Sequence, residues 1–146
     1  QPPQPKAAAP RPSVAALLAG RVLLVEDNPV NQVMTQAMLE RLGLQVVVAG
    51  DGQEALQRYG EQSFDMVLMD VQMPGMDGLT ATQRLRELER QHARPRTPVV
   101  AVTGNPEPEI RERGRAAGMD DFLGKPFTLE QLEMILVRWR RGAQAA

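Results

Sequence analysis

The sequence predicts an α/β fold built on one parallel sheet. Short apolar runs alternate along the chain with stretches of helical spacing, which is the pattern of repeated β-α units. The unit occurs five times, which is too few for a closed barrel of eight units. The 146 residues include no cysteine, so the core forms without disulfides, and a chain of this length buries about two thirds of its unfolded surface.

Five short apolar runs have the length and composition of strands. Most of them are continuous rather than alternating, as expected of strands that helices cover on both faces. The runs are Val22–Val25, Leu44–Val48, Met66–Met69, Pro98–Val102 and Asp121–Leu123. Each run therefore predicts one strand of the sheet.

One helix is expected after each strand. In the first helix the apolar residues follow the i, i+3, i+4, i+7 and i+8 spacing, and Gly43 ends it. These apolar residues are Val30, Val33, Met34, Ala37 and Met38. The other helices are expected over Gln53–Tyr59, around Leu79, Leu85 and Leu88 up to Arg94–Pro95, near Glu107–Ala117, and along Leu129, Leu132, Ile135, Leu136 and Trp139.

These units together predict a doubly wound, flavodoxin-like sheet of five parallel strands in the order 2-1-3-4-5, with five helices on its two faces. Ligands of such sheets bind beyond the carboxyl ends of the strands, at the switch between strands 1 and 3. This edge of the sheet is therefore where functional residues are expected.

The chain divides into a linker, a domain and a short tail. Residues 1–19 are rich in Pro and Ala, which favours an extended linker. Residues 20–142 are expected to form the domain and residues 143–146 a tail. The first residue is Gln1 and no signal peptide is recognisable, so we expect a segment of a longer protein.

Charge and hydropathy exclude several classes of partner. The net charge of −1 gives no basic field that would attract nucleic acid or a membrane surface. No apolar run approaches the length of about 18 residues that a membrane span requires. We therefore expect no nucleic-acid partner, no direct membrane contact and a cytoplasmic location.

Five polar residues lie at the carboxyl ends of four predicted strands. Glu26 and Asp27 end the first strand and Asp70 the third, Thr103 ends the fourth, and Lys125 follows the fifth. The carboxyl ends of parallel strands meet at one edge, so these residues are expected to converge on one crevice.

The predicted crevice suits phosphoryl transfer. Three carboxylates close together repel one another, and a bound cation removes that penalty. Because the available ligands are all hard oxygens, Mg²⁺ is the natural cation. Asp70 could then act as a carboxylate nucleophile toward phosphorus, with Lys125 and Thr103 stabilising the charge on the phosphoryl oxygens.

Purely structural roles are the alternative. Asn28 followed by Pro29 could simply cap a helix, Thr103 could close a strand, and Lys125 could be a solvated surface charge. Each of these interpretations is plausible alone. Five such residues at one edge of a sheet are improbable as an accident.

Four motifs in order resemble the receiver domain of two-component response regulators. They are Val22–Gln32 (VLLVEDNPVNQ), Met69–Gly78 (MDVQMPGMDG), Ala101–Asn105 (AVTGN) and Gly124–Phe127 (GKPF). The forms of the first two are most similar to receivers of hybrid sensor histidine kinases. The resemblance covers Arg21 to about Arg141.

The resemblance implies roles for the metal site. Asp70 would accept a phosphoryl group from a phosphohistidine. Asp27, Asp70 and the main-chain carbonyl of Gln72 would bind Mg²⁺, and Glu26 would hold a metal-bound water.

The resemblance also implies a switch. Lys125 would pair with the phosphoryl oxygens, and the Lys125–Pro126 bond would be cis. Thr103 would shift toward the phosphorylated Asp70, and Phe122 would turn inward behind it.

The leading hypothesis is a phosphorelay receiver that takes its phosphoryl group from a histidine kinase and passes it to a histidine-phosphotransfer protein. The first helix and the loop after the fifth strand are the expected docking surface, with Asn31 and Gln32 near it. Because the chain has no nucleotide-binding loop, we expect self-catalysed phosphoryl transfer to the domain rather than kinase activity by it. The domain itself would be a phosphoacceptor, and its parent is expected to be a hybrid histidine kinase. The alternative is a stand-alone or regulatory receiver that switches partner binding on phosphorylation.

Overall fold

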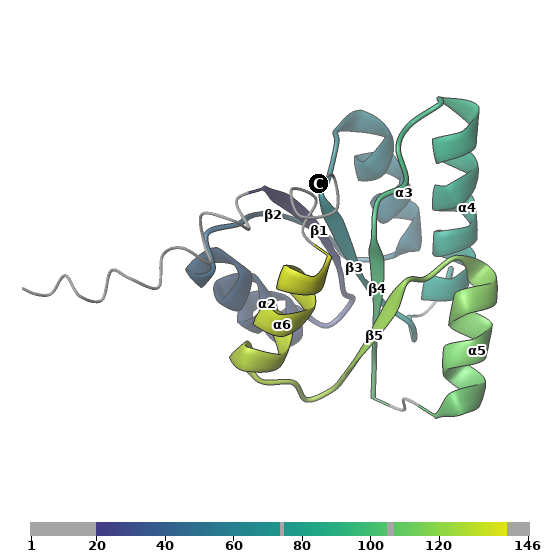
Figure 1. Cartoon of the computed structure of the whole chain (residues 1–146). Helices are drawn as coiled ribbons and strands as arrows, with labels where there is room; N and C mark the ends of the chain where they lie inside the picture. The colour runs from purple at the N-terminus through teal and green to yellow at the C-terminus, as the bar shows by residue number, and fades with distance from the viewer. Residues whose placement is uncertain (1–19, 74, 105–106, 140–146) are drawn as a thin grey trace, which may run out of the picture.

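A computed structural model describes residues 20–73, 75–104 and 107–139 (Figure 1). Five parallel strands form one sheet in the order β2-β1-β3-β4-β5, as predicted. The strands are β1 (Arg21–Val25), β2 (Gln45–Ala49), β3 (Met66–Asp70), β4 (Val99–Thr103) and β5 (Asp121–Gly124). The helices are α2 (Pro29–Arg41), α3 (Gly52–Glu61), α4 (Gly78–Gln91), α5 (Pro108–Ala117) and α6 (Leu129–Arg138).

All five predicted strands and helices are present, with ends that differ by a few residues from the predicted ones. The predicted linker 1–19, the domain end at 140–142 and the tail 143–146 lie outside the described residues. None of the described helices is both long and apolar enough to cross a membrane.

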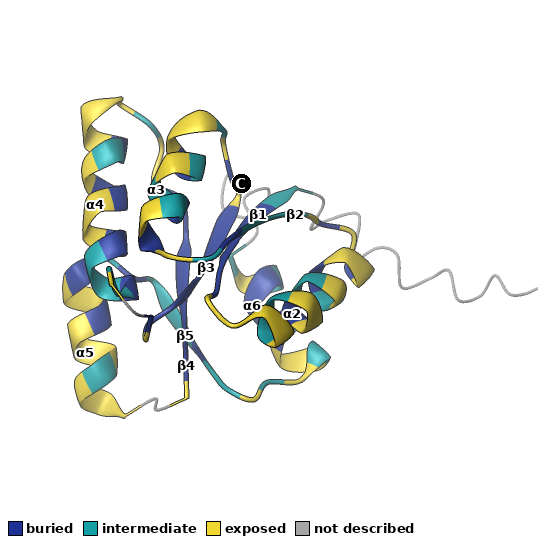
Figure 2. Cartoon of the chain, turned by 180° about the vertical axis from the view of Figure 1, so that it is seen from behind, coloured by how far each residue is buried: buried dark blue, intermediate teal, exposed yellow. Residues whose placement is uncertain are grey.

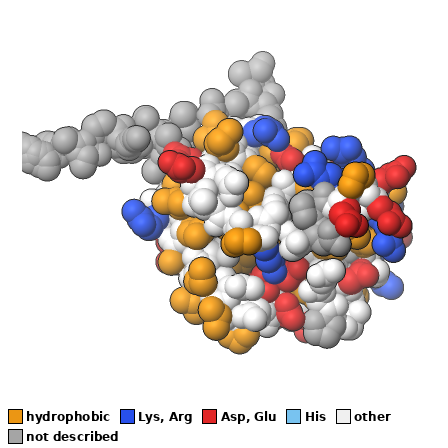
Figure 3. Space-filling model, turned by 90° about the horizontal axis from the view of Figure 1, so that it is seen from below, with side chains coloured by type: hydrophobic (Ala, Val, Ile, Leu, Met, Phe, Trp, Pro, Cys, Tyr) orange, Lys and Arg blue, Asp and Glu red, His pale blue; other side chains and the backbone are white. Residues whose placement is uncertain are grey.

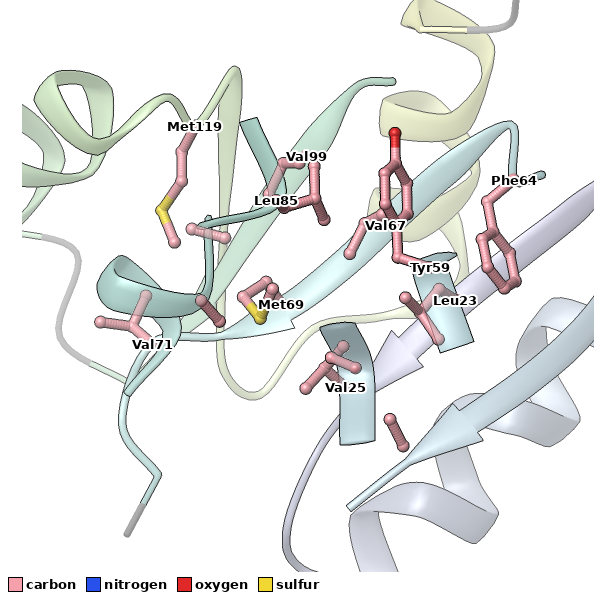
Figure 4. Packing of buried hydrophobic residues seen from close by; sticks show 14 of the residues in the cluster. Leu23, Val25, Tyr59, Phe64, Val67, Met69, Val71, Leu85, Val99 and Met119 are labelled. Carbon is pink, nitrogen blue, oxygen red and sulfur yellow. The ribbon is translucent and has the colours of Figure 1, made fainter. Parts of the chain in front are cut away.

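Helices cover both faces of the sheet. Figures 1 and 2 show α2 and α6 on one face and α3, α4 and α5 on the other. Two clusters of buried apolar side chains fill the two layers. In the cluster under α3 and α4, the labelled side chains of Figure 4 extend from Phe64 and Tyr59 at one end to Val71 at the other. Strands β3 and β4 are buried along their whole length, as continuous apolar runs require.

The predicted helix α2 is present, but three apolar residues of its pattern do not face the sheet. Val30, Val33 and Met34 are 65%, 68% and 53% exposed. The buried residues of the helix are instead Thr35 and Leu39. The helical spacing was correct, and Met38 of the same pattern packs against the core. Spacing alone does not say which of two mixed faces packs against the sheet.

A buried polar network lies at the amino ends of β4 and β5. The Tyr59 hydroxyl donates to Glu89 Oε2 at 2.6 Å, and Arg86 Nη1 lies 3.0 Å from Glu89 Oε1. Arg86 also donates to the carbonyl of Gly118, the residue that caps α5, and it pairs with Asp120 at 2.8 Å. The network therefore joins α3, α4, α5 and the start of β5 at the edge opposite the strand carboxyl ends.

Candidate functional site

The carboxyl ends of β1, β3 and β5 bring three predicted site residues into contact. Lys125 Nζ lies 3.3 Å from Glu26 Oε1 and 3.3 Å from Asp70 Oδ2. The carboxylates of Glu26 and Asp70 are buried, whereas Lys125 is partly exposed. The predicted convergence of residues far apart in the sequence is confirmed for these three.

Asp27 completes a group of three carboxylates. Glu26, Asp27 and Asp70 each offer an oxygen, and these oxygens all lie within 4.8 Å of one another. Asp27 is exposed, which leaves one side of the group open to solvent. An all-oxygen group with an open side fits Mg²⁺, which binds through one or two carboxylates and keeps several waters.

The environment of Asp70 disfavours its charged form. Burial is the main cause that raises the pKa of Asp70 to about 6, and the nearby charge of Glu26 adds to it. The backbone N–H of Gln72, which donates to Asp70 Oδ1 at 3.0 Å, and the Lys125 ammonium act in the opposite direction without cancelling the effect. A cation bound here would favour the ionised carboxylate that can act as a nucleophile.

The nearby carboxylates favour the charged form of Lys125. Burial by itself lowers the pKa of Lys125, but the two carboxylates outweigh it and raise the pKa above its usual value. Lys125 therefore stays protonated at physiological pH and keeps a positive charge beside Asp70.

The loop after β5 positions this lysine. The backbone N–H of Lys125 donates to the carbonyl of Thr103 at 2.8 Å, which ties the loop to the end of β4. The Lys125–Pro126 bond is cis, as the resemblance implied.

Thr103 and Phe122 lie where the strand register predicts. Thr103 is buried at the end of β4. Phe122 is half-buried, and its ring lies so close to Gly114 that a Cβ there would be 2.7 Å from it. The guanidinium groups of Arg111 and Arg115 flank the ring at 5.9 and 5.8 Å from its centroid.

Two residues outside the predicted site shape the loop after β1. The Asn28 side chain caps α2 by accepting from the backbone N–H groups of Val30 and Asn31, so its structural role is confirmed. Gln32, expected at the docking surface, donates from Nε2 to the carbonyl of Glu26 at 2.6 Å. Asn28-Pro29 was a recognisable capping signal, whereas no sequence pattern predicted the hydrogen bond between Gln32 and the carbonyl of Glu26.

A groove of about 320 Å³ adjoins the crevice. Glu26 and Lys125 line it together with Met34 and Met38 of α2 and with Pro126 and Phe127 of the loop after β5. Figure 3, which views the molecule from below, shows hydrophobic side chains gathered beside a group of acidic ones. An apolar surface therefore continues directly into the charged crevice.

Comparison with known proteins identifies a family. The model of the response regulator receiver domain matches residues 22–137. The sensor protein GacS of Pseudomonas syringae is 40% identical over 121 residues, which are 83% of this chain and 13% of that protein. The chain thus spans about an eighth of the length of this relative.

Solved structures give the same result. A receiver domain of a Pseudomonas aeruginosa sensor histidine kinase, with magnesium in its active-site cleft, is 42% identical with a TM-score of 0.75, covering 83% of this chain and 97% of that one. A receiver domain in complex with a histidine-phosphotransfer protein of Saccharomyces cerevisiae is 28% identical with a TM-score of 0.80, covering 86% and 91%.

Proposed function

The chain belongs to the response regulator receiver domain family, and from this premise we propose that Asp70 accepts a phosphoryl group from a phosphohistidine and passes it to a histidine-phosphotransfer protein. The observation that carries the proposal is the crevice itself. It combines a buried carboxylate, a lysine 3.3 Å from it and two further carboxylates that could hold a cation.

In the proposed step a carboxylate oxygen of Asp70 attacks the phosphorus of the phosphohistidine. A P–O bond forms, the P–N bond breaks, and the leaving imidazole nitrogen keeps the electron pair and takes up a proton from water. The Lys125 ammonium stands close enough to Asp70 to pair with the phosphoryl oxygens, where negative charge is spread during transfer. Onward transfer repeats the exchange with the histidine of the second partner as the nucleophile.

We assign Mg²⁺ to the three carboxylates. Bound Mg²⁺ would supply positive charge to the phosphoryl oxygens and reduce the repulsion between Asp70 and its neighbours. Asp27 and Asp70 would be direct ligands, with the main-chain carbonyl of Gln72, and Glu26 would hold a metal-bound water. Thr103 and Phe122 would form the switch that responds to the phosphorylated Asp70.

The docking surface proposed for the phosphotransfer protein is the exposed apolar face of α2 together with the adjoining groove. Val30, Val33 and Met34 are exposed although they are apolar, and contiguous exposed apolar surface is typical of interaction sites. The groove leads from this face to Lys125. A partner that covers the patch with an apolar helix would bring its histidine to the crevice.

The longer proteins to which this chain is similar suggest what kind of protein it comes from. Curated relatives include sensor kinases such as GacS, of which this chain matches only a small part. We infer that residues 20–142 form the receiver of a hybrid histidine kinase, after the linker 1–19, and that it works in the cytoplasm with a kinase phosphohistidine as donor.

Incubation with acetyl phosphate and Mg²⁺, followed by mass spectrometry, tests the proposed acceptor. One phosphoryl group is expected on Asp70, and none in Asp70→Asn. Labelling retained in that variant would show that another residue accepts the group. If phosphate then appears on an added phosphotransfer protein, the chain acts in a relay; phosphorylation-dependent self-association without onward transfer would favour the regulatory alternative.

The docking surface has a separate test. Val33→Glu should reduce onward transfer at least tenfold while leaving the labelling by acetyl phosphate unchanged, because a buried unpaired charge opposes association. Met134→Glu is the matched control, since Met134 is 66% exposed on the neighbouring helix α6 and lies outside the groove. Equal transfer by both variants would place the docking surface elsewhere.

A further inference from the structure

Asp27 is the most exposed of the three clustered carboxylates. No hydrogen bond or ion pair to its carboxylate occurs among the residues that the structure describes. Its direction is therefore set by the backbone on either side of it. Since Mg²⁺ demands near-ideal octahedral geometry, something must fix that backbone if Asp27 is a ligand.

Two side chains fix the two peptide planes that flank Asp27. The carbonyl of Glu26, on the preceding plane, accepts the hydrogen bond from Gln32 Nε2 at 2.6 Å. The N–H of Asn28, on the following plane, donates to Glu26 Oε2 at 3.1 Å. With both planes held, the φ and ψ angles of Asp27 have little freedom, and its Cβ points in one direction.

The carboxylate that holds the second plane is itself fixed, because Glu26 is buried and its other oxygen faces Lys125. Gln32 is the more informative member of the pair. It lies one turn into α2, half-buried, and its amide reaches back over the loop rather than out to solvent. Its backbone N–H donates to the carbonyl of Asn28 within the first turn of the helix, which anchors it to the same loop.

We propose that Gln32 is a positioning residue for the metal site: its amide holds the peptide before Asp27 so that this exposed carboxylate is directed at the cation in advance. This inference rests on the proposed function. It differs from the expectation that Gln32 belongs to the docking surface, because the side-chain amide of Gln32 is hydrogen-bonded to the carbonyl of Glu26.

The test replaces Gln32 by a side chain of equal length without a donor. Gln32→Met should weaken Mg²⁺ binding about tenfold, the lower end of what contacts behind metal ligands contribute, as measured by isothermal titration calorimetry. The rate of labelling by acetyl phosphate should fall at low Mg²⁺ concentration and recover at saturating Mg²⁺. The free energy of unfolding in EDTA should change little.

Gln36→Met is the matched control. Gln36 lies one turn later on the same helix, and its Nε2 donates to Glu40 Oε2 at 3.2 Å on the exposed surface. This variant should bind Mg²⁺ as the wild type does.

The outcomes separate this inference from the proposed function. Failure of the wild type to bind Mg²⁺ would overturn both. Equal Mg²⁺ affinity of the wild type and Gln32→Met would overturn only the positioning role. Unchanged affinity with impaired onward transfer at saturating Mg²⁺ would also overturn it, and would return Gln32 to the docking surface.

Discussion

The two edges of the sheet differ in the balance between their carboxylates and their positively charged groups. At the amino ends of β4 and β5, Arg86 and Arg96 face Glu89 and Asp120, and each of the two carboxylates is paired with a guanidinium. At the carboxyl ends, the Lys125 ammonium pairs with the carboxylates of Glu26 and Asp70, and the nearby carboxylate of Asp27 adds a third negative charge. The first edge is balanced and the second carries excess negative charge.

This difference indicates that the balanced edge stabilises the fold, whereas the negatively charged edge is suited to binding a cation. A satisfied buried network contributes to a unique structure, and a half-satisfied one is costly. At the functional edge, burial raises the pKa of Asp70 to about 6, and the nearby charge of Glu26 adds to this effect. We interpret the unfavourable free energy of the charged Asp70 carboxylate as a feature that favours the binding of a cation.

The largest effect is expected at the balanced edge. Arg86→Met would leave Glu89 buried without its guanidinium, so the free energy of unfolding should fall by about 3–5 kcal/mol. Urea denaturation measures this. The control is Arg84→Met, an exposed arginine of the same helix, for which a change of about 0.5 kcal/mol or less is expected. Equal effects would mean that the network does not secure the fold.

The second prediction concerns pH at the functional edge in the absence of metal. With a pKa of about 6 when folded and 3.8 when unfolded, Asp70 holds its proton in the folded state over this interval. The unfolded state has already released that proton, so stability falls as pH rises from 3.8 to 6. The loss is about 3 kcal/mol and is complete above pH 6.

Comparison with Asp70→Asn tests this effect, because titratable groups away from the cluster contribute equally in both proteins. The variant should gain stability relative to the wild type between pH 4 and pH 7, as measured by urea denaturation in EDTA. A constant difference across this range would show that Asp70 ionises normally.

Tyr59→Phe also tests the balanced edge, with a smaller expected loss of stability than Arg86→Met. Burial, followed by the hydrogen bond to Glu89, raises the pKa of Tyr59 to about 12, so the hydroxyl stays a donor at all working pH values. Its removal deprives Glu89 and Thr97 of a partner and should cost about 2 kcal/mol. Thermal unfolding at pH 7 measures the loss, and an unchanged midpoint would show that the hydroxyl is dispensable.

The smallest effect is expected from the cation. Mg²⁺ at ten times its dissociation constant should stabilise the protein by about 1.4 kcal/mol, and EDTA should reverse the gain. Asp27→Asn should reduce the gain, whereas Asp51→Asn, which alters the cap of α3 outside the cluster, should not. Equal gains in both variants would place the cation elsewhere.

The sequence predicted the strand order and the main site residues because they follow from local patterns and one topological rule. Glu26, Asp70 and Lys125 each follow or end a recognisable strand, and parallel strands bring such residues to one edge. The contact of Gln32 with the Glu26 carbonyl could not be predicted in this way, since it depends on the path of a loop and on one rotamer.

The amino-acid sequence by itself determined the α/β alternation, the positions of the carboxylates and the chemistry open to them, because periodicity and strand ends are properties of neighbouring residues. Only the tertiary structure decided which face of α2 is exposed and that Arg86 and Glu89 are buried together. Burial depends on what distant segments place against a surface. A charged residue on a helix has the same local pattern whether solvent or an opposite charge lies beside it.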